Sequence, residues 1–169
     1  KSPPKSALEL KNHVMKHKGR ITFPQPPDFV GTSFLKQILI ELISDKKILK
    51  LKYISEKHEK ALDPLWKWLD EVTPYLWRKG KNYPSNYLAM TELVAEREID
   101  FGIAFNIAHA SNAISEGKLS KSVRSYIHHQ GTLANVHFLA IPYNSSKKAA
   151  SKVFVNFLIS PEAQIKKQN

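Results

Sequence analysis

The stretch that most constrains this chain covers residues 20–34, because it contains three prolines within four positions. Proline lacks a backbone N–H and fixes its φ angle, so neither a helix interior nor a strand ladder continues through residues 24–27. We therefore predict a short strand at residues 21–23, a stiff loop, and a helix that opens at residues 31–33. Either Thr32 or Ser33 is the expected N-cap of that helix.

Length and composition favour a globular protein. The chain has 169 residues, 42% of them hydrophobic, which suits one compact domain or two small lobes. The formal net charge of +11 suits nucleic acid, an anionic membrane surface or an anionic solute, but the cationic residues are scattered among acidic ones. The absence of cysteine excludes disulfides and thiol chemistry. No apolar run approaches the roughly 20 residues that cross a bilayer, and no signal peptide opens the sequence.

Further helices are predicted from capping residues and apolar spacing. Ser6 and Glu9 form a capping box, and Asp63-Pro64 reads as an N-cap followed by proline in the first turn. The helix from Pro64 is expected to break at Thr73-Pro74. The other predicted helices follow N-cap Ser85, span residues 108–116 and 147–158, and follow N-cap Ser160.

Four more segments are predicted as strands, at residues 45–60, 99–105, 123–127 and 136–142. In the first of them Ile48, Leu49, Leu51 and Tyr53 nearly alternate with polar residues, and a polar exit follows. The run at 99–105 is almost continuously apolar, which is typical of a buried parallel strand. Its carboxyl end leads into Asn106, where open α/β sheets hold their ligands. The order of strand, loop and helix predicts an α/β fold with a mostly parallel sheet flanked by helices.

The sequence contains no recognisable catalytic or metal-binding pattern. His13 and His17 are four residues apart on a predicted helix, but the residue after His13 is Val14 and not the glutamate of a metalloprotease motif. No phosphate-binding loop or nucleophile elbow is present either. We therefore expect a binding protein without a cofactor or metal, and not an enzyme. A basic nucleic-acid-binding module that uses aromatic and cationic residues 77–83 is the alternative.

Several motifs occur together in an order that resembles a known family. They are residues 23–31, residues 74–84, Glu98-Ile-Asp-Phe with Asn106, Ile141-Pro-Tyr-Asn, and Phe157-Leu-Ile followed by Ser160-Pro-Glu-Ala-Gln. As a set they resemble the branch of type 2 periplasmic binding proteins described as thiamine-transport solute-binding proteins. The resemblance implies an extracytoplasmic or periplasmic, monomeric protein of an ABC importer. Such a protein delivers a small solute to a membrane permease, and nucleic acid is not an expected partner.

The resemblance also implies two lobes and a ligand cleft between them. Residues 1–130 would form the second lobe, and residues 131–169 the crossover and the segment that returns to the first lobe, so we expect the chain to be a fragment. The implied ligand-binding residues are Asp28, Phe29, Gly31, Thr32, Ser33, Tyr83, Ser85, Phe105, Asn106, Thr132 and Asn135. Helix N-termini would receive anionic or hydroxyl groups, and aromatic rings would stack on a ring or cation. A thiamine-like cation with a phosphate or hydroxyl tail would use both, and an oxyanion only the first. The crossover departs from the family pattern near residues 134–137, which lack its second glycine and small hydroxyl residues.

Overall fold

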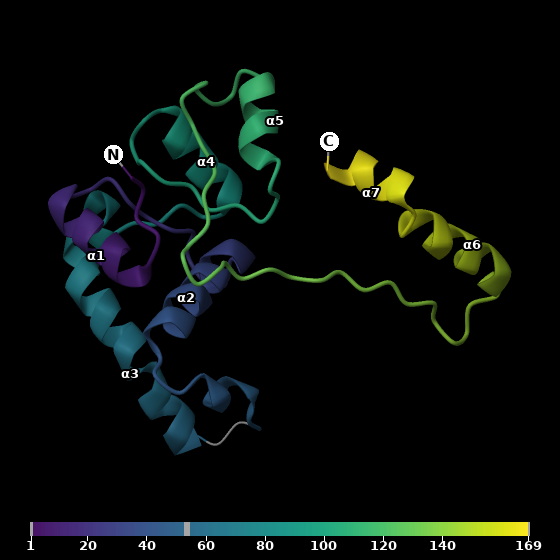
Figure 1. Ribbon diagram of the computed structural model, residues 1–169, viewed down its shortest axis with the longest axis horizontal. Helices are drawn as coiled ribbons and strands as arrows, with labels where there is room; N and C mark the ends of the chain where they lie inside the picture. The colour runs from purple at the N-terminus through teal and green to yellow at the C-terminus, as the bar shows by residue number, and fades with distance from the viewer. Residues whose placement is uncertain (1, 53–54, 169) are drawn as a thin grey trace.

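The computed structural model describes residues 2–52 and 55–168, and the regular secondary structure of these ranges is entirely helical. The helices are α1 (Ala7–Lys16), α2 (Phe29–Leu42), η1 (Lys46–Lys50), α3 (Ser55–Val72), η2 (Thr73–Tyr75), η3 (Trp77–Gly80), α4 (Tyr87–Ala95), α5 (His109–Ser115), α6 (Lys148–Leu158) and α7 (Pro161–Gln168). The helices labelled η are short 3₁₀ helices. Figure 1 shows a packed body formed by α1 to α5, with α6 and α7 standing apart from it.

The predicted α/β fold with a mostly parallel sheet is wrong for the part of the chain described here, which contains no β-strand. Residues 21–25 are extended and buried up to Pro24, but their backbone groups bond to separate loops. The Ile21 carbonyl accepts from the Trp77 amide at 2.8 Å, whereas the preceding Arg20 carbonyl accepts from the Asp100 amide at 2.7 Å. A ladder needs successive bonds to one neighbouring strand, and these bonds diverge.

The other predicted strands also differ from the structure. Residues 99–105, 123–127 and 136–142 have no regular secondary structure. Residues 46–50 form the 3₁₀ helix η1, because Asp45 caps it by accepting from the Lys47 amide at 3.0 Å. Tyr53 of that predicted strand lies outside the described residues, and the last part of the segment, residues 55–60, belongs to α3.

Local capping signals predict two helix starts correctly. Ser6 accepts from the Glu9 amide at 3.2 Å, and Ser160 accepts from the Ala163 amide at 3.3 Å. Two other starts are shifted. Asp28, and not Thr32 or Ser33, caps α2, while Asn86, and not Ser85, caps α4. In both cases a nearby side chain of similar capping strength accepts the hydrogen bonds of the first-turn amides.

Helix α3 begins earlier than predicted. It starts at Ser55, so Pro64 lies inside the helix and Asp63 is not its N-cap. Both Asp63 and Pro64 are exposed, and water can satisfy the carbonyl that proline leaves without an amide partner. The predicted break at Thr73-Pro74 is confirmed, because α3 ends at Val72 and η2 follows.

The main core lies where α1, α2 and α3 meet residues 21–23. Its buried members are Ala7, Leu10, Val14, Ile21, Phe23, Ile38, Leu39, Ile43, Leu65, Trp68, Val72 and Leu76. The Trp68 indole N–H also donates to the Ala7 carbonyl at 2.9 Å, which ties α3 to the first turn of α1. Gly31 lets α2 approach the proline loop, since a Cβ there would lie 1.9 Å from the Pro24 carbonyl oxygen.

A second, smaller core joins α4 to the start of α2. Val30, Met90 and Ile99 are buried there. The Arg20 guanidinium connects this part to the main core, because it donates to the Asp100 carboxylate at 2.6 Å and to the carbonyls of Arg97 and Glu98. Loops that follow α4 are thereby fixed to the segment that precedes the prolines.

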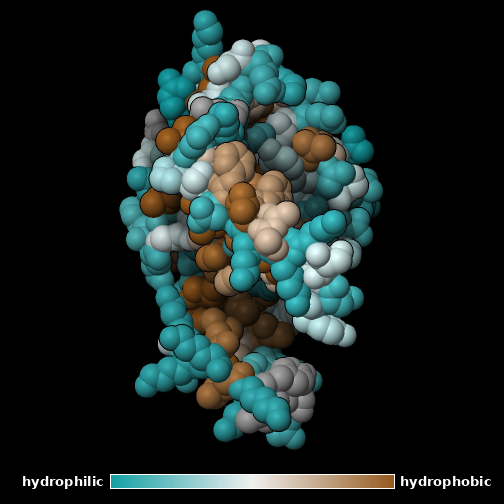
Figure 2. All heavy atoms as spheres, turned by 90° about the vertical axis from the view of Figure 1, so that its right-hand side faces the viewer, coloured by the Kyte–Doolittle hydropathy of each residue, from teal (hydrophilic) through white to brown (hydrophobic). Residues whose placement is uncertain are grey.

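Residues 134–168, which we call the arm, leave this body as an extended strap that ends in α6 and α7 (Figure 1). Three apolar residues of α6, Val153, Phe154 and Phe157, are 72%, 61% and 48% exposed. Every residue classed as buried in the described chain lies between Pro4 and Leu119. Figure 2 views the molecule from the side of α6 and α7, and it shows apolar side chains gathered in the centre and in the lower half of this face.

Candidate functional site

Asp28 occupies the N-terminus of α2. Its Oδ1 accepts from the Val30 amide at 2.8 Å and from the Gly31 amide at 3.0 Å, and its carbonyl accepts from the Thr32 amide at 2.9 Å. The amides that the sequence offered for an anionic ligand are thus satisfied within the chain. What α2 presents at this end is a carboxylate whose charge opposes a bound anion.

The predicted anion site at the second helix start is also filled. The Asn86 side chain accepts from the Ala89 amide at 3.0 Å at the N-terminus of α4, while Ser85 remains exposed just before it. Ser85 lies in an open hollow that is also lined by Asp28, Gln25 and the proline pair 26–27. The Gln25 amide donates to the Pro84 carbonyl at 2.9 Å, which holds the two loops together.

An aromatic pair adjoins the Asp28 cap. The rings of Phe29 and Phe105 have centroids 4.9 Å apart with an interplanar angle of 36°. Phe29 is 58% exposed although it belongs to the first turn of α2, so a large aromatic side chain faces solvent at the residue that follows the capping Asp28. This pair joins residues that are 76 positions apart in the sequence.

Two predicted ligand residues serve the fold in this structure. The Tyr83 ring is half-buried, 5.1 Å from the Phe23 ring of the main core. The Asn106 side chain accepts from the Ala108 amide at 2.9 Å and so shapes the turn into α5. Asn106 is exposed, but no contact connects it to Asp28.

Of the two predicted crossover residues, the structure brings one close to α2. The Thr132 hydroxyl accepts from the His128 amide at 3.4 Å, and the residues on both sides of Thr132 bond to Gln37 of α2. Ser33 and Gln37 are four residues apart and share a helix face, so Thr132 lies about one turn along α2 from Ser33. Asn135 is exposed at the start of the arm, where its side-chain amide lies 3.4 Å from the His137 ring, and His137 is not one of the predicted site residues.

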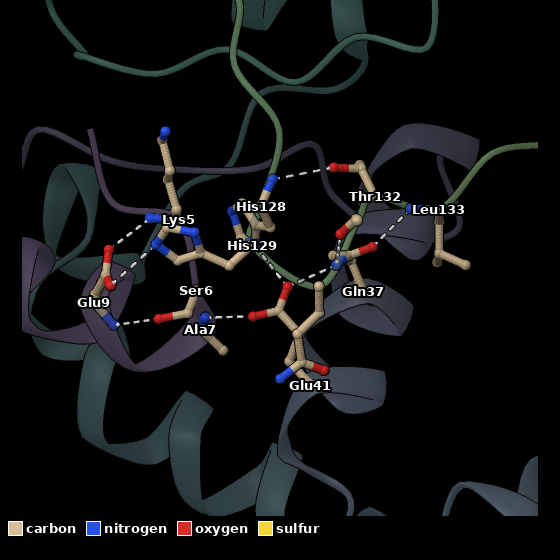
Figure 3. A network of polar contacts seen from close by, with 12 residues as sticks. Lys5, Ser6, Ala7, Glu9, Gln37, Glu41, His128, His129, Thr132 and Leu133 are labelled. Atoms are coloured by element: carbon tan, nitrogen blue, oxygen red, sulfur yellow. Dashed lines mark hydrogen bonds and ion pairs between the residues drawn. The ribbon is translucent and has the colours of Figure 1, made fainter. Parts of the chain in front are cut away.

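A polar cluster next to Thr132 was not predicted from the sequence (Figure 3). Glu41 accepts from the Ala7 amide at 2.6 Å, the Gln37 side-chain amide at 2.6 Å and the His128 ring at 2.5 Å. The signal was available, since Gln37 and Glu41 are polar residues four apart that flank the apolar residues 38–40.

A second pair of titratable groups joins α4 to α5. The Tyr87 hydroxyl lies 2.5 Å from Nδ1 of His109, and the two rings meet edge to face. Burial lowers the pKa of His109 and raises the pKa of Tyr87, so both side chains favour their neutral forms. A neutral pair that shares one hydrogen bond stabilises the contact between these helices.

The described residues contain no cluster of three or more histidine, cysteine or acidic side chains that could hold a metal ion. Within the same ranges, no helix combines the length and the apolar character needed to cross a membrane. His13 and His17 lie close together, with ring centroids 4.3 Å apart, and the His13 ring also meets the Phe101 ring edge to face and lies 3.9 Å from the Asp100 carboxylate. Burial and the adjacent His17 lower the pKa of His13.

Comparison with known proteins assigns the chain to a family. The family model described as "Bacterial extracellular solute-binding protein" matches residues 1–168. Because this match covers almost the whole chain, the protein belongs to the bacterial extracellular solute-binding proteins.

A curated relative supports this assignment. Over 165 residues the chain is 40% identical to "Protein YnjB" of Escherichia coli (strain K12). The alignment covers 98% of this chain and 42% of the relative, so the chain spans less than half the length of that protein. No solved structure gives a significant match.

Proposed function

We propose that this chain is the solute-capturing part of an extracytoplasmic binding protein that serves an ABC importer. Membership of the solute-binding family supports the general role. The geometry that carries the proposal is the N-terminus of α2, where the Asp28 carboxylate lines an open hollow and the next residue, Phe29, is an exposed aromatic ring that packs on Phe105. A carboxylate and an exposed aromatic ring at one helix end supply the two kinds of contact that a small organic cation uses.

The same geometry favours a cationic solute over an oxyanion. Asp28 and Asn86 cap α2 and α4, so an incoming anion would compete with an existing carboxylate for the α2 amides. A ring or quaternary nitrogen would instead gain from the negative charge of Asp28 and from the face of Phe29. We therefore propose a thiamine-like cation as the class of cargo, with Ser85 and the exposed edge of the hollow available to its polar tail.

The proposed capture uses two lobes. Residues 1–130 form one wall of the cleft, and residues 131–169 form the crossover and a segment that packs into the other lobe. Apolar side chains along the arm support this division, because Phe138 and Tyr143 are 89% and 91% exposed and need a surface to cover them. Closure around the solute would create the shape that a membrane permease recognises, in the periplasm or an equivalent extracytoplasmic space.

A thermal-shift titration tests the cargo. A ligand that binds the folded state raises the midpoint by mass action, by about 2.7 kcal/mol at a hundredfold excess over Kd. We expect thiamine to raise the midpoint and sulfate or inorganic phosphate to leave it unchanged. Asp28→Asn should abolish the thiamine shift while the helix stays capped, because asparagine caps as well as aspartate.

Asp45→Asn is the matched control. Asp45 caps η1 in the same way that Asp28 caps α2, but it lies away from the hollow, so its variant should keep the thiamine shift. A shift with sulfate or phosphate that survives Asp28→Asn would replace the cation by an oxyanion. No shift with any of these solutes would reject the proposed site.

The nucleic-acid alternative makes a different prediction. Trp77 would be its main stacking platform, but the Arg78 guanidinium already lies 4.2 Å from the Trp77 ring centroid, and the indole N–H donates to Glu98. Binding to an oligonucleotide should weaken steeply as salt rises, whereas a pocket for one small cation depends on salt only slightly. Salt-sensitive binding of single-stranded DNA, lost in Trp77→Ala, would favour the alternative.

A further inference from the structure

The arm is attached to the body through one short segment, residues 128–133. Backbone amides of this segment donate hydrogen bonds to two separate parts of the body. The His129 amide donates to the Lys5 carbonyl at 2.8 Å, before α1, and the Leu133 amide donates to the Gln37 side chain at 2.7 Å, on α2. Beyond residue 133 the chain is extended and mostly exposed until α6.

The Gln37 side-chain amide forms hydrogen bonds to this segment through both its oxygen and its nitrogen. Its oxygen accepts from the Leu133 amide, and its nitrogen donates to the Gly131 carbonyl at 3.1 Å. These two bonds flank Thr132 and fix its backbone on α2. Gln37 is only 8% exposed, so an unsatisfied amide at this place would be costly.

Glu41 accepts hydrogen bonds from Gln37 and from two groups close to the segment, and so fixes their positions. Its side chain is 3% exposed and accepts from three donors, which come from the first turn of α1, from Gln37 and from His128. The bond from Gln37 fixes the orientation of its amide, with the oxygen toward Leu133. A buried carboxylate with three donors is stable here, whereas loss of one donor leaves charge uncompensated.

We propose that Gln37 and Glu41 are positioning residues that fix segment 128–133 on α1 and α2 and thereby set where Thr132 and the arm begin. Leucine at position 37 and glutamine at position 41 are similar in volume to the native side chains, so these substitutions remove hydrogen bonds without opening a large cavity. Any contact between Thr132 and a solute rests on the proposed function, but the anchoring does not.

Hydrogen exchange measured by mass spectrometry without any solute tests the anchoring. In Gln37→Leu we expect the amides of residues 129–133 to exchange about tenfold faster, the effect of losing one or two hydrogen bonds. Glu41→Gln should accelerate the same amides, because one nitrogen then faces a donor. The amides of α4, far from the cluster, should exchange at the wild-type rate in both variants.

Two variants control for the substitutions themselves. Lys36→Leu places the same leucine at the adjacent exposed position of α2, and Glu59→Gln makes the same charge change on the exposed face of α3. In both control variants the amides of residues 129–133 should exchange at the wild-type rate. Equal acceleration in every helix, or none at residues 129–133, would overturn the proposal. If Glu41→Gln does not fold, Gln37→Leu alone decides. A positive exchange result without any thiamine shift would leave the anchor established and remove the proposed cargo.

Discussion

The body and the arm are built from similar helices but differ in what those helices contact. In the body, α1 buries Ala7, Leu10 and Val14 against α2 and α3. In the arm, α6 has an equally apolar stripe, yet Val153 and Phe154 are largely exposed. Among the described residues, α6 has its main helix contact with α7 and none with the body that is comparable.

This difference distinguishes local interactions, which start a helix, from contacts between distant segments, which bury its apolar face. Capping by Ser6 and Ser160 starts a helix in either region. An isolated helix of 11 residues such as α6 is nevertheless marginal in water, because most helical stability comes from packing an apolar face. The arm therefore carries the pattern of a packed helix pair, and the body supplies no surface for it.

The same substitution in both regions tests the comparison with the largest expected effect. Ile38 is fully buried in the main core, whereas Ile159 is 64% exposed after α6. Ile38→Ala should lower the free energy of unfolding by about 2–5 kcal/mol, because it removes buried methyl groups and leaves a cavity. Ile159→Ala should change it by less than about 0.5 kcal/mol. Chemical denaturation of both variants gives the two values.

Similar losses at Ile38 and Ile159 would contradict the division into body and arm. They would mean that Ile159 is buried in solution, for example between two copies of the chain. Repeating the denaturation at several protein concentrations separates these cases, because only an association makes stability depend on concentration.

What the sequence predicted correctly is local. The N-caps Ser6 and Ser160, the break at Thr73-Pro74 and the helix predicted at residues 108–116 depend on neighbouring residues. The sheet was predicted from apolar runs such as residues 99–105, but a strand exists only where a second segment pairs with it. Here residues 99–105 pack onto α4 and the main core as irregular chain. The α/β prediction failed at this non-local step.

The candidate site shows the same limit. Asp28 and Phe29 were predicted at the site, and Phe29 does meet Phe105. The function of Asp28 as a cap, however, depends on where α2 begins, which the sequence placed a few residues too late. The Glu41 cluster joins three segments, so no local spacing could identify His128 as its partner.

Acid should destabilise the body more than the arm, with a smaller effect than Ile38→Ala. Burial and His17 lower the pKa of His13 in the folded state, so the unfolded chain binds more protons just below its ordinary pKa of about 6.5. The contribution of neutral His13 to the free energy of unfolding is fully present above pH 6.5 and is lost as the pH falls through the lowered pKa of the folded state. His13→Gln should therefore reduce the drop in thermal midpoint between pH 7 and pH 5.

His137→Gln is the matched control in the arm. His137 is exposed, and its contacts are with Asn135 and Lys167 of the arm. Its variant should follow the wild-type profile of midpoint against pH. A reduced drop in His137→Gln, or an unchanged drop in His13→Gln, would show that packing of the body does not cause this acid sensitivity.

The smallest expected effects come from two buried or half-buried threonines of the body, and they test whether apolar burial alone stabilises it. The Thr22 hydroxyl is buried without a hydrogen-bond partner among the described residues, while the Thr73 hydroxyl donates to the Leu69 carbonyl at 2.6 Å. Thr22→Val should leave the free energy of unfolding within about 0.5 kcal/mol or raise it, because it removes an unsatisfied group. Thr73→Val should lower it by about 1 kcal/mol, because it removes a bond. If Thr22→Val were the more destabilising of the two, the hydroxyl of Thr22 would have a partner in solution, and the space around residues 21–23 would hold a polar group or water rather than packed apolar atoms.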